Sequence, residues 1–208
     1  MSTIRPGAAA LACLVLSAVG CDDEMDGDKE VVDAAVDRVR DAGAEPSEDD
    51  QIPPMGRDAL EAWLADGVYN AWHCEPKPHL ARSPSPHGYN RICANDAIAD
   101  NIAGTDDWPK GAAAVKELYA SADSSEIIGY AVYLKTEDDS AGGDNWYWYE
   151  RLPLDNPAPQ DDKGVVADGL GDQGPEKTIC VGCHVAAGAD PAHTPSAGGR
   201  DQVYTPVK

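Results

Sequence analysis

The chain has 208 residues, and its 37 acidic residues against 16 lysines and arginines give a net charge of −21. An acidic surface of this kind repels phosphates, which excludes nucleic acid as the expected partner. The chain contains no phenylalanine, so tryptophan and tyrosine must supply the aromatic part of its core.

The first twenty residues have the pattern of an export signal. Arg5 gives a positive start, and the apolar run from Ala8 to Val19 is too short to span a bilayer comfortably. Ala18-Val19-Gly20-Cys21 is similar to a bacterial lipobox, although it lacks the usual leucine three places before the cysteine. We therefore expect a signal peptide over residues 1–20 and a lipid on Cys21, which would anchor the protein on the periplasmic side of a bacterial membrane. An ordinary cleaved signal is the second interpretation and a transmembrane anchor the third.

An acidic segment follows the signal. Thirteen acidic and three basic side chains lie between Asp22 and Asp50, a net charge of −10 and about half of the total. Such a segment cannot bury enough apolar surface to order itself. We expect a disordered tether over residues 21–52 and a single domain over residues 53–208.

The first half of this domain begins with a helical pattern. Asp58 is placed to cap a helix that starts at Ala59, and its apolar face extends to Trp72 with a break at Gly67. Residues 75–91 contain four prolines and predict a long surface loop. Residues 96–102 predict a short helix, and residues 108–111 a turn.

The second half contains the strand patterns. Residues 112–119 are ambiguous, because their alanines favour a helix whereas Val115, Leu118 and Tyr119 fit either structure. Residues 127–134 and 146–149 predict an antiparallel pair of strands, with Trp146 and Trp148 on one face and Tyr147 and Tyr149 on the other. Residues 156–174 are expected to form a loop, after which Pro175 leads into a short helix.

That helix carries the sequence Cys180-Val181-Gly182-Cys183-His184. Two thiols at this spacing can reach both vinyl groups of one haem, and the adjacent imidazole then points to the iron from one side. A redox dithiol does not need a following histidine but does need a thioredoxin-like context, which this sequence lacks. A zinc site needs two further ligands, and only His193 is near in sequence. We expect one covalent haem c, with His184 as the axial ligand of the iron.

The remaining cysteines can be assigned by elimination. Cys13 leaves with the signal and Cys21 takes the lipid, so Cys74 and Cys93 are left in an oxidising compartment. We expect these two to form a disulfide; two unrelated buried thiols are the alternative.

The sequence also bears on the second axial position of the iron. The methionines lie in the signal, in the tether and at its end, at Met1, Met25 and Met55. The candidate histidines are His73, His79, His87 and His193, and none has a clear claim. We therefore expect a five-coordinate iron with an open site, which binds small molecules, whereas a six-coordinate haem mostly transfers electrons.

Three segments, taken in order, resemble the cytochrome P460 family, which includes the β-type cytochromes c′. They are Trp108-Pro109-Lys110-Gly111 with Ala112 to Leu118, Asn145-Trp146-Tyr147-Trp148-Tyr149, and Cys180 to His184 with Ala186-Ala187 and Asp201-Gln202-Val203-Tyr204-Thr205. The resemblance covers residues 57–208. It implies an α+β fold, mainly antiparallel β-sheet with a few helices and a C-terminal haem-binding helix, often in a homodimer. Residues 112–119 would then be a strand.

The family also implies two kinds of chemistry. P460 enzymes oxidise hydroxylamine and carry a lysine cross-linked to the haem, a position that Lys116 matches. β-type cytochromes c′ bind nitric oxide or carbon monoxide under an apolar cap, often of phenylalanine, which this chain would have to build from Trp, Tyr, Leu or Ile. No acidic residue of Ile127–Leu134 matches the one that proton-coupled oxidation needs.

The orientation of Lys116 remains open between the solvent and the haem. Facing the haem would turn Val115 and Glu117 outward, although Val115 is better buried.

The sequence thus predicts an exported haem protein that binds or oxidises small nitrogen species, with a redox partner protein. An electron-transfer cytochrome is the alternative, followed by a structural lipoprotein.

Overall fold

The computed structural model describes residues 48–82, 85–104, 106–189 and 199–204. The predicted signal peptide, the lipid on Cys21 and most of the acidic tether lie outside the described residues, as does His193. None of the helices in the described ranges is long and apolar enough to cross a bilayer.

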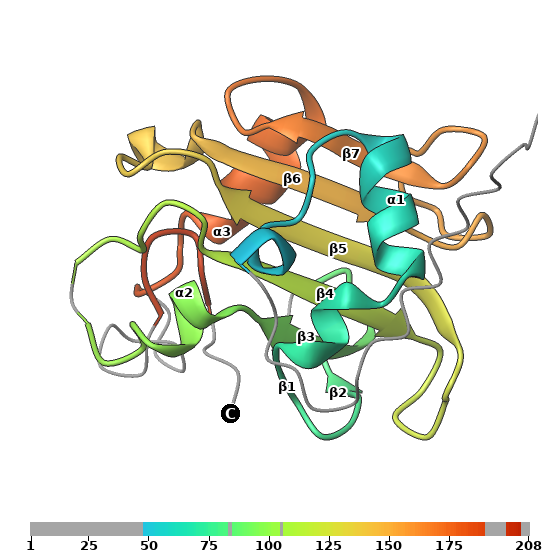
Figure 1. Ribbon diagram of the computed structural model, residues 1–208. Helices are drawn as coiled ribbons and strands as arrows, with labels where there is room; N and C mark the ends of the chain where they lie inside the picture. The colour runs from blue at the N-terminus through green and yellow to red at the C-terminus, as the bar shows by residue number, and fades with distance from the viewer. Residues whose placement is uncertain (1–47, 83–84, 105, 190–198, 205–208) are drawn as a thin grey trace, which may run out of the picture. The chain divides into compact units, whose positions relative to one another are not determined.

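The fold is mixed α/β and is built on one antiparallel sheet of seven strands (Figure 1). The strands follow one another in the order β1-β3-β4-β5-β6-β7, and β1 and β2 pair with opposite ends of β3. Their bounds are β1 His73–Cys74, β2 His79–Leu80, β3 Tyr89–Ala94, β4 Ala113–Tyr119, β5 Ile127–Lys135, β6 Trp146–Arg151 and β7 Val165–Leu170. The predicted mainly antiparallel fold with a few helices is therefore confirmed.

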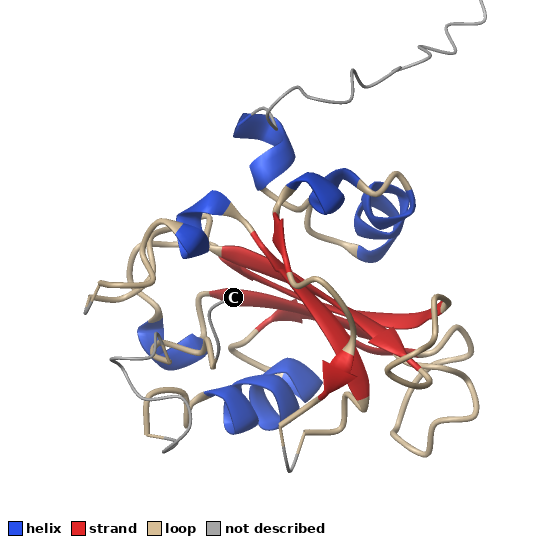
Figure 2. Ribbon diagram, turned by 90° about the horizontal axis from the view of Figure 1, so that it is seen from below, coloured by secondary structure: helices blue, strands red, loops and turns tan. Residues whose placement is uncertain are grey.

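Short helices lie on both sides of this sheet (Figure 2). The α-helices are α1 Arg57–Ala65, α2 Asp96–Ala99 and the single turn α3 Gly182–His184. Three 3₁₀ turns, η1 Glu48–Gln51, η2 Val68–Ala71 and η3 Ala141–Gly143, and one π-helical segment, η4 Glu176–Val181, complete the set. The main-chain oxygens of Asp50 and Gln51 in η1 accept hydrogen bonds from the side chains of Trp72 and Asn95, so the folded part begins before Pro53.

The ambiguous segment is strand β4, in the middle of the sheet. It pairs residue by residue with β3 and with β5, which satisfies its backbone groups and overrides the helical preference of its alanines. Both of its faces are buried. Val115 and Glu117 face away from Lys116, as alternation requires, but they lie in the interior and not at the surface, with 0% and 1% exposure. The expected conflict between burying Val115 and turning Lys116 inward therefore does not arise.

The alternation predicted for β6 is also confirmed. Tyr147 and Tyr149 belong to the core that α1 and η2 cover, together with Leu60 and Leu64. Trp146 and Trp148 belong to the core on the other face, with Trp108 and Val181.

Two predictions of local structure are wrong: the loop over residues 165–170 and the cap at Asp58. Asp168 is involved in both. Residues 165–170 form strand β7 and not a loop, since Val165 to Ala167 are buried against the sheet and Asp168 stays extended. Helix α1 starts after Gly56, and no side chain of the neighbouring residues caps its N-terminus, so Asp58 does not cap it. Asp168 of β7 takes over that role: its Oδ2 accepts from the main-chain N–H of Arg57 at 3.1 Å.

The other predictions of local structure are mostly correct. The helix breaks at Gly67, which adopts a left-handed conformation with φ 65°, and a short helix follows Asn95. The proline-rich residues 75–91 are less irregular than predicted, because His79–Leu80 adds a short strand to the edge of β3.

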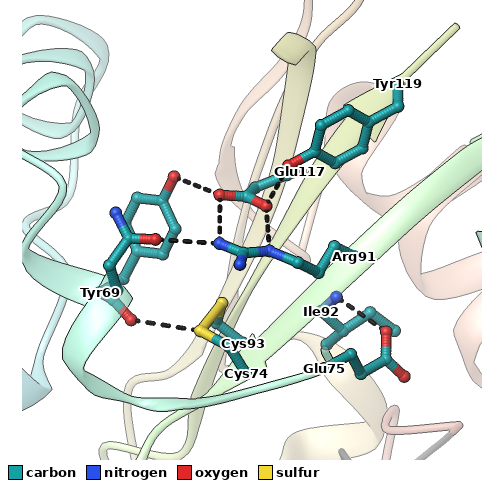
Figure 3. Close-up of a disulfide and its surroundings, with 9 residues drawn as sticks. Tyr69, Cys74, Glu75, Arg91, Ile92, Cys93, Glu117 and Tyr119 are labelled. Atoms are coloured by element: carbon teal, nitrogen blue, oxygen red, sulfur yellow. Dashed lines mark hydrogen bonds and ion pairs between the residues drawn. A yellow bond between two sulfur atoms is a disulfide. The ribbon is translucent and has the colours of Figure 1, made fainter. Parts of the chain in front are cut away.

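The disulfide between Cys74 and Cys93 is present and joins β1 to β3, where the two residues are direct cross-strand partners (Figure 3). Beside it, the buried carboxylate of Glu117 accepts hydrogen bonds from Tyr69, Arg91 and Tyr119. The bridge and this cluster hold both ends of the chain between residues 75 and 92 against the sheet.

Candidate cofactor site

A cavity of about 450 Å³ lies on the face of the sheet that carries Trp148. Three parts of the chain line it: the central strands, residues 79–82 and 85–87, and the segment that carries Cys180, Cys183 and His184, together with Tyr204. This volume is in the range of pockets that hold small molecules and cofactors. The three segments of the family resemblance meet here, through Lys116, Trp148 and His184.

Small residues in the middle of the sheet make room for this cavity. Ala114 on β4 and Ala131 on β5 line it, and Ala131 is the direct cross-strand partner of both Lys116 and Glu150. Strands lie about 4.8 Å apart, so the backbones of Lys116 and Glu150 are separated by only about 10 Å. Their longer side chains project over the alanine between them and place a cation and an anion in the same hollow.

Burial changes the acidity of Lys116. Loss of hydration lowers its pKa to about 8, although the negative charge of Glu150 acts in the opposite direction. A substantial neutral fraction is therefore present near pH 8. Lys116 thus lines the cavity with a half-buried side chain, on the face of β4 opposite to Val115 and Glu117.

The imidazole of His184 is held in one orientation. Its Nδ1 lies 2.6 Å from the main-chain oxygen of Gln202, and because a carbonyl only accepts, Nδ1 carries the hydrogen. Burial, followed by the charge of Lys116, lowers the pKa of His184 to about 3, so the ring is neutral. The lone pair of Nε2 is then available to a metal, the arrangement typical of metal-binding histidines.

Aromatic rings surround this imidazole. Trp148 lies edge-on at a centroid distance of 4.7 Å, Tyr204 at 5.3 Å and Tyr133 at 6.0 Å. Tyr133 and Trp148 also line the cavity, together with Ile92 and Leu80. The larger apolar side chains of the lining therefore include Tyr, Trp, Ile and Leu.

The segment that holds His184 is itself fixed to the sheet. Asp201, next to Gln202, accepts hydrogen bonds from the fully buried Lys135 at 2.8 Å and from the main-chain N–H of Trp108 at 3.1 Å. Three residues after Asp201, the hydroxyl of Tyr204 donates to the main-chain oxygen of Cys183. Residues 200–204 thus connect the sheet to both the histidine and one cysteine, a role that the sequence alone did not reveal.

Both thiols of the pentapeptide line the cavity and are unbridged. Burial raises the pKa of Cys180 to about 12, and the charges of Glu150 and Glu176 add to this effect. A redox dithiol needs a lowered pKa at its attacking cysteine, so this environment disfavours that alternative. No group of three ligands suited to a metal ion comes together within the described residues.

Two further polar residues line the cavity, of which the sequence analysis named only His87, as a candidate iron ligand. Glu150, with 4% exposure, places an acidic group in the cavity, from β6 and not from Ile127–Leu134. His87 comes from the loop, and its Nδ1 lies 3.0 Å from Oε1 of Glu150. The alternation of β6 could have revealed Glu150, since it lies on the same face as Trp148. Nothing local in the sequence indicates that His87 lies beside Glu150.

The other candidate ligands are less suitable. His79 lines the cavity, but both of its ring nitrogens have partners, Nε2 with Glu75 at 2.8 Å and Nδ1 with the main-chain oxygen of Leu80 at 3.0 Å. His73 forms an ion pair with Asp96 and is not part of the lining. Met55 is 55% exposed and is also absent from the lining.

No protein-family model, curated protein or solved structure matches the chain. The resemblance to the cytochrome P460 family therefore remains a prediction based on the three sequence segments.

Proposed function

We propose that this cavity holds one haem c, bound covalently by Cys180 and Cys183 and ligated at the iron by His184. The observation that carries the proposal is the convergence of both unbridged thiols and of an imidazole with an available Nε2 on one largely apolar cavity. The donor set fits the group: two thiols for the vinyl carbons and one neutral imidazole for the iron. Residues 176–184 are then the haem-binding helix of the fold.

The residues of the chain have separate tasks in this proposal. The carbonyl of Gln202 orients His184 and increases its basicity as a ligand. Tyr133 and Trp148 pack against the imidazole ring of His184 and exclude water from it. Haem, when bound, supplies the redox and gas-binding chemistry, while Lys116, Glu150 and His87 give the cavity a polar region that can bind a small polar molecule.

We infer that the iron is five-coordinate and that the protein binds or oxidises small nitrogen species, nitric oxide or hydroxylamine. No methionine among the described residues lines the cavity, His79 contacts Glu75, and His87 contacts Glu150. An acid and two nitrogen bases beside the site suit a reaction that moves protons with electrons. A plain electron-transfer cytochrome, the alternative, needs no such polar region in its haem cavity.

Other parts of the proposal follow from the sequence. Export, a lipid on Cys21, a redox partner protein, a homodimer and a cross-link between Lys116 and the haem all remain predictions.

The experiment is expression with haem-ligation machinery, followed by extraction with acidic organic solvent and a pyridine haemochrome spectrum. Haem should stay with the polypeptide and should be lost in Cys180→Ser/Cys183→Ser. Cys74→Ser/Cys93→Ser is the matched control, because it removes the other pair of cysteines. Haem that extracts from the wild-type protein contradicts covalent attachment.

The coordination state needs a second measurement. A ferrous absorption spectrum should show high-spin iron that responds to carbon monoxide. A low-spin spectrum unchanged by carbon monoxide favours electron transfer and refutes the open site.

A further inference from the structure

His87 and Glu150 form a pair that the haem-binding residues do not explain. His87 lies on the loop between the two disulfide cysteines, and Glu150 lies on the central strand β6. Their side chains are only 13% and 6% exposed, and both line the cavity. Burying an imidazole and a carboxylate together is costly unless they interact, which marks the pair as one unit.

The geometry of the pair determines the state of the imidazole. Nδ1 of His87 lies 3.0 Å from Oε1 of Glu150, close enough for a hydrogen bond, although the N–H bond does not point directly at that oxygen. A carboxylate only accepts, so the hydrogen of the neutral ring belongs on Nδ1. Nε2 is then left with a lone pair. Bonds between catalytic groups are often poorly aligned before a ligand binds.

The surroundings of His87, burial above all, favour this neutral form. Burial and the ammonium group of Lys116 lower the pKa of His87, and the carboxylate of Glu150 only partly opposes them. Lys116, with a pKa of about 8, is mostly protonated at pH 7 and is the poorer base there. The neutral His87 is therefore the better proton acceptor of the two.

We propose that His87 exchanges the proton of the molecule that binds beside the haem iron, and that Glu150 is a positioning residue which acts through His87. This inference rests on the proposed haem site. The alternative is that the carboxylate of Glu150 itself accepts the proton, but Glu150 would need no imidazole beside it for that role. The disulfide contributes by holding the loop that carries His87 to β3.

Hydrogen cyanide and carbon monoxide are a suitable pair of probes. Hydrogen cyanide must release its proton to bind ferric iron as cyanide; in the proposal this proton passes to Nε2 of His87 while the carbon–hydrogen bond breaks. Carbon monoxide binds ferrous iron without any proton transfer. The ratio of the two association rates therefore reports on proton transfer and cancels changes in access to the iron.

The experiment measures both rates by stopped flow at pH 7 in the haem-loaded protein. In His87→Gln we expect cyanide association to slow by about 10²-fold or more, the usual contribution of a general base, and carbon monoxide association to change by less than about threefold. Glu150→Gln should slow cyanide by less than His87→Gln does. His73→Gln is the matched control, since His73 is outside the lining, and it should leave both rates unchanged.

Several outcomes would overturn the proposal. Parallel changes of both rates would show an effect on access only. A large loss in Glu150→Gln without one in His87→Gln would assign the proton to the carboxylate itself. A low-spin wild type that becomes high-spin in His87→Gln would make His87 an iron ligand, and it would refute the five-coordinate state while leaving the covalent haem intact. His87→Asn serves as the second variant if His87→Gln does not load haem.

Discussion

The buried ion pair between Lys135 and Asp201 should be among the most sensitive points of the molecule. Lys135 is fully buried, and its Nζ lies 2.8 Å from Oδ2 of Asp201, whose side chain is 5% exposed. In Asp201→Asn the ammonium group would stay buried without its anion. Breaking a buried pair from one side costs about 3–5 kcal/mol. For a domain of this size, that corresponds to a fall in Tm of about 6–20 °C.

The opposite change should cost less. In Lys135→Met, Asp201 still accepts from the main-chain N–H of Trp108 and from the hydroxyl of Ser140, so we expect a loss of about 1–3 kcal/mol. The double variant contains no unpaired buried charge. It should therefore be less destabilised than the sum of the two single variants.

Urea unfolding followed by tryptophan fluorescence gives the free energies for this cycle. The exposed pair of Lys110 and Glu137, 3.2 Å apart, is the matched control, and Lys110→Met should cost less than about 1 kcal/mol. Strictly additive effects of Lys135→Met and Asp201→Asn, or an Asp201→Asn variant as stable as the control, would refute the reasoning. Since Gln202 orients His184, Asp201→Asn should also lower the amount of haem that remains ligated.

Three further predictions concern other parts of the structure. Cys74→Ser/Cys93→Ser should lower the unfolding free energy by about 3 kcal/mol in urea titrations, and an unchanged midpoint would contradict it. The stability of the wild type relative to Lys116→Met should rise by about 3 kcal/mol between pH 8 and pH 10.5, because the unfolded lysine keeps its proton over this range and the buried one does not; a flat difference in urea titrations across that range would refute it. Gly143→Ala should cost about 1–3 kcal/mol in the same assay, because φ is 108° and the new Cβ would lie 2.6 Å from Val181; a loss below 0.5 kcal/mol would show that η4 can move aside.

Sequence patterns predicted the parts of the fold that depend on alternation. The faces of β6 and the pairing of β5 with β6 follow directly from the order of Trp and Tyr along the strand. Strand β7 was not predicted, because Asp168-Gly169 has the composition of a turn. What keeps Asp168 extended is tertiary: its main-chain N–H donates to Glu176 and its side chain accepts from Arg57.

In the candidate site, too, the sequence predicted the local arrangement but not the contacts between distant residues. The pentapeptide predicted which residues would lie together around His184, because their spacing is local. The partners of these residues come from distant positions: Gln202 is 18 residues from His184, and His87 reaches Glu150 from another part of the chain. Lysines on strands usually face the solvent, but β4 is a central strand that is covered on both faces. The position of Lys116 could therefore not be predicted from the sequence.

The disulfide has a consequence for how this protein could change. The chain between Cys74 and Cys93 is tied to the sheet at both ends, so insertions or deletions within residues 76–88 need not disturb the pairing of β3 with β4. A single inserted residue in β4, by contrast, would exchange its two faces and put Glu117 where Lys116 stands. Variation that alters which molecules the cavity accepts is therefore tolerated best in this loop, and a library of sequences grafted over residues 76–86, which keeps His87 and β3, is the natural starting point for redesigning its selectivity.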